Sequence, residues 1–128
     1  MDNEIKLSDA EWKLMSALWE KAPRTLSELV SVFRADSAWS KSTVVTLLRR
    51  MQDKGAVRFE EGARARRYYP AVSRGTLVRQ ETGSFIQKVC GGNTGLLLSA
   101  LVDEGTATPQ ELAALRAVLD RAKEASGQ

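Results

Sequence analysis

Histidine is absent from this 128-residue chain, and cysteine occurs once, at Cys90. Zinc sites of ordinary spacing are built from Cys and His ligands, so we expect neither a metal site nor a cofactor. A lone cysteine cannot form an intramolecular disulfide, which fits a reducing compartment and a cytoplasmic protein. The missing histidine also disfavours an enzyme, because His is the most frequent general acid or base.

Long apolar runs and phosphate-binding loops are missing as well. The chain nowhere holds the roughly 18 consecutive apolar residues that cross a bilayer, so we expect no membrane association. The glycine-rich stretch "CGGNTG" follows no strand signal and predicts a break between two helices. The alternative of a small carboxylate enzyme requires a pair of acidic side chains in a cleft, for which "FEEG" and "VDEG" are the candidates. We interpret "FEEG" as a hairpin turn and "VDEG" as the end of a helix. These absences favour a binding protein.

Positive charge is concentrated in the middle of the chain, although the formal net charge is only +3. Residues 40–79 hold ten Lys/Arg against three Asp/Glu, whereas residues 1–39 hold five against seven and residues 80–128 hold four against six. Such a local excess is expected where a protein binds phosphates. The alternative is a basic surface that serves only solubility.

Two capping boxes predict two short helices near the start of the chain. Ser8 with Glu11 begins the first helix, and Thr25 with Glu28 begins the second. The apolar side chains that follow recur at helical spacing, and we assign them, tryptophans included, to the core: Trp12, Leu14, Met15, Leu18, Trp19, Leu26, Leu29, Val30 and Phe33.

The stretch "SKSTVVTLLRRMQDKG", residues 40–55, predicts a third helix that is capped by Ser40 or Ser42 and ends at Gly55. Its inward side is apolar, and the remaining arc is polar except for Val45. Ser and Thr are poor helix formers, so their presence on this arc needs another reason. Hydroxyl and guanidinium groups contact bases and phosphates in the major groove, and we therefore predict a recognition helix.

Residues 56–70, "AVRFEEGARARRYYP", alternate between apolar and polar side chains and predict a β-hairpin with Gly62 in the turn and arginines at the tip. Three helices followed by a basic hairpin are typical of a winged helix-turn-helix. We predict DNA contacts from ten residues: Ser40, Lys41, Ser42, Thr43, Thr46, Arg49, Arg50, Arg64, Arg66 and Arg67.

The fold class is therefore mainly α (α+β), with a winged-helix DNA-binding domain over residues 1–73 and a helical dimerisation domain over residues 74–128. The second part has too few apolar residues to form a core of its own. Thr108 as the N-cap and Pro109 at the first helical position predict the start of its last helix. A second chain would cover its apolar side chains: Phe85, Val89, Leu97, Leu98, Leu101, Leu112, Leu115 and Leu119. The alternative is a monomer whose arm folds back on its own winged helix.

A dimer would hold two recognition helices about one DNA turn apart, ~34 Å, which implies a palindromic double-stranded operator. Two alternatives remain open. One is a winged-helix module that binds protein, and the other is a ligand-sensing regulator with a small pocket between arm and wing.

The chain resembles the penicillinase and methicillin repressor family of winged-helix regulators (BlaI/MecI/CopY type) over nearly its whole length. The resemblance is carried by four stretches: "LSDAEWKLMSALW", "WSKSTVVTLLRRMQDKGAV", "RRYYPAVS" and "GNTGLLLSALV". It implies a dimeric repressor on palindromic sites of resistance or transport genes. Ser40, Thr43, Thr46 and Arg50 match the family's DNA-contacting pattern.

The resemblance also implies a sensor or protease that relieves repression by cleaving the arm. The Asn-Phe bond cleaved in the antibiotic-responsive members aligns with Ser99 and Ala100, which makes this pair a candidate cleavage position. Relatives often carry Lys and Arg where this chain has Ser42 and Val45, so the operator sequence does not transfer. The copper-responsive members have a C-terminal cysteine cluster that "DRAKEASGQ" lacks.

Overall fold

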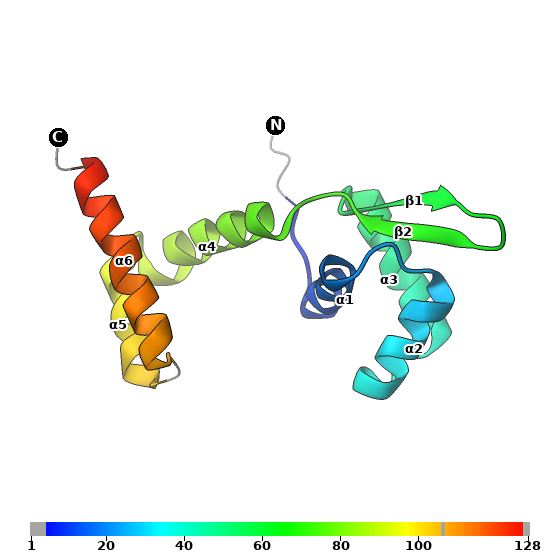
Figure 1. Cartoon of the computed structure of the whole chain (residues 1–128), viewed down its shortest axis with the longest axis horizontal. Coiled ribbons are helices and arrows are strands. Elements are labelled where there is room, and N and C mark those ends of the chain that lie inside the picture. Colours follow the sequence, from blue (N-terminus) through cyan, green and yellow to red (C-terminus); the bar gives the residue numbers. More distant parts are fainter. Residues whose placement is uncertain (1–4, 106, 127–128) are drawn as a thin grey trace. The chain divides into compact units, whose positions relative to one another are not determined.

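The structure is a computed structural model that describes residues 5–105 and 107–126. These residues form six helices and one two-stranded antiparallel sheet (Figure 1). The chain divides into two compact units, residues 1–82 and 83–128. The first unit contains three helices and the hairpin, which is the predicted winged-helix arrangement.

Capping boxes begin the first two helices, as predicted. Ser8 and Glu11 exchange hydrogen bonds of 3.2 and 2.8 Å at the start of α1 (Asp9–Glu20). Thr25 and Glu28 do the same, at the same distances, at the start of α2 (Leu26–Ser37). Each box satisfies backbone N–H groups that the first helical turn leaves without partners.

The third helix, α3 (Lys41–Lys54), follows α2 after a tight turn. Ala38 caps α2 in the left-handed conformation, with φ at 55°. Ser40 is the N-cap of α3, because its Oγ accepts a hydrogen bond from Thr43 N. Gly55 ends the helix with φ at 83°, a conformation that glycine adopts without steric cost. The helix, its cap and its end are as predicted.

The hairpin consists of β1 (Val57–Glu61) and β2 (Arg66–Pro70), with Phe59 paired to Tyr68. In the turn Gly62 N donates to Ala65 O, and a Cβ on Gly62 would clash with that carbonyl oxygen. Arg24, just before α2, forms an isolated antiparallel bridge with Tyr68 by exchanging two backbone hydrogen bonds. This bridge, which we did not predict, ties the hairpin to the segment between α1 and α2.

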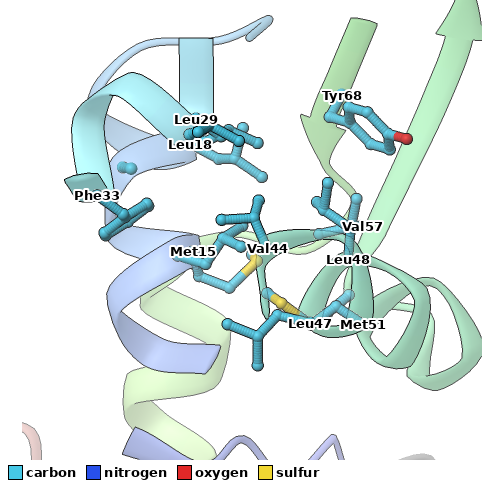
Figure 2. Packing of buried hydrophobic residues seen from close by; sticks show 14 residues of the cluster. Met15, Leu18, Leu29, Phe33, Val44, Leu47, Leu48, Met51, Val57 and Tyr68 are labelled. Atoms are coloured by element: carbon cyan, nitrogen blue, oxygen red, sulfur yellow. The ribbon is translucent and has the colours of Figure 1, made fainter. Parts of the chain in front are cut away.

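The core lies between the three helices and the base of the hairpin (Figure 2). Side chains from all of these elements meet there: Leu14, Met15, Ala17, Leu18, Leu29, Val30, Phe33, Val44, Leu47, Leu48, Met51, Ala56, Val57 and Tyr68. The tryptophans match the prediction in part. Trp19 is half-buried and packs against the core, and its Nε1 donates to Val72 O, whereas Trp12 is half-buried and packs on Trp19. The wide indole therefore seals the core and keeps its N–H satisfied.

Three further helices follow, α4 (Arg74–Cys90), α5 (Thr94–Glu104) and α6 (Pro109–Ser126). The division between the two units falls inside α4, after Thr82, whereas we predicted a boundary after residue 73. Leu77, in the first unit, is buried. Beyond residue 82, none of the side chains whose burial is described is buried.

No single helix within residues 5–105 and 107–126 is long and apolar enough to cross a membrane, and only α4 and α5 taken together, bent by 94°, reach that length and composition.

Candidate nucleic-acid interface

The outward face of α3 carries most of the residues that we assign to DNA contact. Ser42, Thr46 and Arg50 are spaced four residues apart, so they lie along one side of the helix. All three are exposed, and with Thr43 and Leu47 they line a shallow depression of about 270 Å³. The opposite side of the helix is buried in the core. Hydroxyl and guanidinium groups are therefore held outward on a firmly packed helix.

Hydroxyl groups also cluster at the N-terminus of α3. Ser40 Oγ lies 3.1 Å from Ser42 Oγ and 3.1 Å from Thr43 Oγ1. Ser40 Oγ also caps the helix by accepting from Thr43 N. These hydroxyls thus satisfy one another and the first turn, and the N-terminal end of a helix favours anions.

Four cations of this surface have no carboxylate partner within the described part of the chain: Lys41, Arg49, Arg50 and Arg64. All four are exposed. Lys41 opens α3, and Arg64 lies in the turn of the hairpin. Cations that share a surface repel one another, and a bound polyanion relieves that repulsion.

The hairpin places its arginines differently from the prediction. Only Arg64 lies in the turn, whereas Arg66 and Arg67 open β2 and point to opposite faces of the ribbon. Arg66 lies 4.0 Å from the ring centroid of Phe59, and its Nε donates to Glu61 Oε2. Phe59 and Glu61 therefore orient the Arg66 side chain at the basic end of the hairpin.

The other face of the ribbon is stiffened by a second set of contacts. The guanidinium carbon of Arg58 lies 4.2 Å from the ring centroid of Tyr69, and both side chains donate to the carboxylate of Glu60. The hydrogen bond from Arg58, followed by that from Tyr69, holds the pKa of Glu60 below its ordinary value. The wing thus carries cross-strand contacts on both faces.

An ion pair between the buried carboxylate of Glu11 and the exposed side chain of Lys54 joins α3 to α1. Lys54 Nζ lies 2.6 Å from Glu11 Oε1 and also donates to Lys6 O at 2.6 Å. Burial raises the pKa of Glu11, but the hydrogen bond from Lys54 and the backbone hydrogen bond from Ser8 outweigh it and hold this pKa below its ordinary value. Sequence reasoning found only the capping role of Glu11, because its partner is 43 residues away.

The apolar side chains that we assign to dimerisation lie on the three helices that follow the wing. Phe85, Val89, Leu101, Leu112 and Leu119 are exposed in the single chain, with Val89 the most open at 62%. Three others are half-buried: Leu97, Leu98 and Leu115. Ser99 and Ala100, the candidate cleavage position, are exposed residues within α5. An exposed apolar set of this size is uncommon on a soluble monomer.

Taken together, the helix-turn-helix, its polar third helix and the basic hairpin define the winged-helix fold of DNA-binding regulators. Residues 7–121 match the penicillinase repressor family, and the chain belongs to that family. Its members are transcriptional repressors.

Known proteins of this kind align with most or part of the chain. The methicillin resistance regulatory protein MecI of Staphylococcus aureus is 26% identical over 122 residues, which cover 94% of this chain and 99% of MecI. The DNA-binding domain of the repressor BlaI superposes with a TM-score of 0.53 at 28% identity, covering 58% of this chain and 90% of that domain. Monomeric BlaI of Bacillus licheniformis, solved in complex with the blaP half-operator, superposes with a TM-score of 0.50 at 28% identity. The superposition covers 55% of this chain and 85% of the BlaI chain.

Proposed function

We propose that this protein is a repressor that binds a palindromic operator as a dimer and controls resistance or transport genes. The observation that carries the proposal is the outward face of α3, where Ser42, Thr46 and Arg50 line one shallow depression. Beside it lie cations that form no ion pair with any described residue. A protein-binding winged helix would instead present an apolar patch on this helix.

The residues would divide the work by their chemistry. Arg50 and Thr46 would contact base edges, because a guanidinium can donate two hydrogen bonds to guanine and a threonine methyl can pack on thymine. Lys41, Arg49 and Arg64 would bind backbone phosphates, and Arg67 would do so from the hairpin. Phosphate contacts supply affinity and base contacts supply sequence preference.

Dimerisation would cover the exposed apolar side chains of the arm. The described side chains after residue 82 include none that is buried, which supports a partner chain that would cover the apolar ones. A two-fold axis through the arms would give the operator its palindromic symmetry. The BlaI complex contains a half-operator, which fits one winged helix for each half-site.

Relief of repression would follow from separating the dimer. Cleavage by a sensor-activated protease at Ser99–Ala100 would sever the arm, and the exposure of both residues allows access. Because the bond lies inside α5, a protease would act after local opening of that helix.

Footprinting of the tagged protein across its own genome tests the proposal without a guess at the operator. We expect enrichment at a short palindrome near genes for a membrane sensor, a transporter or a hydrolase. A variant with Thr46→Ala and Arg50→Ala serves as the matched control and should lose the enrichment. A profile that is flat in several growth conditions, or equal in this variant, contradicts the assignment.

A further inference from the structure

A groove of about 550 Å³ lies between α2, the start of α3 and β2, all within the first unit. Small-molecule sites in proteins commonly occupy roughly 300–1,000 Å³. None of the residues that line the groove belongs to the arm, so it is not the pocket between arm and wing that the sequence left open.

The inner surface of the groove is apolar. Leu26 and Val30 contribute from α2, and Tyr68 contributes from β2. Val30 and Tyr68 are only 8% exposed, so they form a firm floor that belongs to the core. An occupant therefore gains from having an apolar body, since contact with this floor removes apolar surface from water.

The rim of the groove is cationic. Arg34 comes from α2, Lys41 from α3 and Arg66 from β2, and no carboxylate of the described residues lines the groove. Within residues 5–105 and 107–126, Arg34 and Lys41 form no ion pair. Arg66 is held by Phe59 and Glu61. Three positive groups around one opening, two of them without a partner, favour an anionic ligand.

Hydroxyl groups complete the lining. Ser27 and Ser31, one turn apart on α2, are exposed and can donate hydrogen bonds to an anionic oxygen. The groove thus combines a few polar groups with an apolar floor, as small-ligand sites do.

We propose that this groove binds a small organic anion, with an aromatic or branched aliphatic body and one carboxylate, and that this ligand weakens operator binding. The body would rest on Leu26, Val30 and Tyr68, and the carboxylate would meet the cationic rim. Lys41 and Arg66 also belong to the proposed DNA interface, so a bound anion would neutralise charge that the phosphates need. The effect on DNA rests on the proposed function, whereas ligand binding does not.

Titration of the 15N-labelled full chain with 2-naphthoate tests the binding directly. The neutral 2-naphthalenemethanol and inorganic phosphate are titrated in parallel to separate the apolar from the anionic contribution. We expect saturable amide shifts confined to residues 26–34, 41 and 65–68, with a Kd of about 1 mM or below. The alcohol and phosphate should each bind at least about fivefold more weakly.

Arg34→Gln removes one rim charge without touching a residue of the proposed DNA interface. It should weaken 2-naphthoate binding about 5- to 10-fold and leave the weak binding of the alcohol unchanged. Arg116→Gln, an exposed site on α6, is the matched control and should bind 2-naphthoate like the wild type.

Amide shifts that do not saturate with 2-naphthoate, or that spread over the whole chain, would show that the groove is not a specific binding site. If inorganic phosphate binds as tightly as 2-naphthoate, the proposal that the groove binds an organic anion is wrong. The groove would then be a binding site for a phosphate of the DNA backbone. Saturating 2-naphthoate should then raise the Kd for operator DNA, and an unchanged Kd overturns the regulatory effect. A protein that binds 2-naphthoate in the groove but no DNA contradicts the proposed function and leaves the ligand site standing.

Discussion

Lys54 Nζ and Glu11 Oε1, 2.6 Å apart, join the end of α3 to the first turn of α1. Glu11 is fully buried, and its second oxygen, Oε2, has no hydrogen-bond partner among the described residues. The pair therefore anchors the proposed recognition helix to the scaffold behind it. Because a buried charge without its partner is costly, this contact should be sensitive to either residue.

Glu11→Gln keeps the shape of the side chain and removes its charge. We expect it to lower the free energy of unfolding by about 1–3 kcal/mol, as measured by urea denaturation. Glu28→Gln is the matched control, because Glu28 has the same place in the capping box of α2 but is exposed. Equal losses in the two variants would show that the ion pair adds nothing beyond the cap.

The same pair predicts a pH dependence. The pKa of Glu11 is below its ordinary value of 4.5 in the folded protein, so its contribution to stability is fully present above that pH. The contribution is lost as the pH falls through the lower folded pKa. Urea denaturation between pH 6 and pH 3 should show the stability difference between wild type and Glu11→Gln shrinking toward acid. A constant difference would exclude the linkage.

Replacing side chains on the α3 face should reduce sequence-specific binding without unfolding the protein. Arg50→Ala and Thr46→Ala should each cost about 1–3 kcal/mol of operator affinity, because each removes a base contact. Fluorescence anisotropy with labelled operator measures the loss, and thermal melting checks the fold. Arg116→Ala should bind normally. Wild-type affinity in both α3 variants would refute the recognition helix.

The wing should contribute affinity that does not depend on sequence. Arg64→Ala combined with Arg67→Ala should weaken binding to operator and random DNA alike, and make the salt dependence shallower by about 1–2 in log–log slope. Arg66 is spared because it also packs on Phe59. Lys88→Ala, on α4, serves as the control. A slope equal to that of the wild type would remove the wing from the interface.

The arm should hold the dimer together. Leu101→Glu and Leu119→Glu each place a charge on an exposed apolar position, and each should weaken the dimer about 10- to 100-fold. Analytical ultracentrifugation over a dilution series measures this, with Leu101→Met as the conservative control. Dimers of unchanged stability in both glutamate variants would place the interface elsewhere.

Local signals predicted the winged helix well. Ser8 with Glu11, Thr25 with Glu28, and Ser40 with Gly55 mark helix ends through hydrogen bonds that span only a few residues. Long-range contacts were not predictable in the same way. The bridge between Arg24 and Tyr68 and the packing of Arg66 on Phe59 depend on how the hairpin meets the helices.

The groove illustrates the same limit. The local sequence around Arg34, Lys41 or Arg66 does not predict that they share a groove, because the three residues lie on three different elements. By itself, the sequence determined the three helices, the basic hairpin and the polar face of α3, since capping and hydrophobic periodicity act over a few residues. Only the tertiary structure decided that Glu11 meets Lys54 and that three cations surround one apolar floor, because packing brings together residues far apart in the chain.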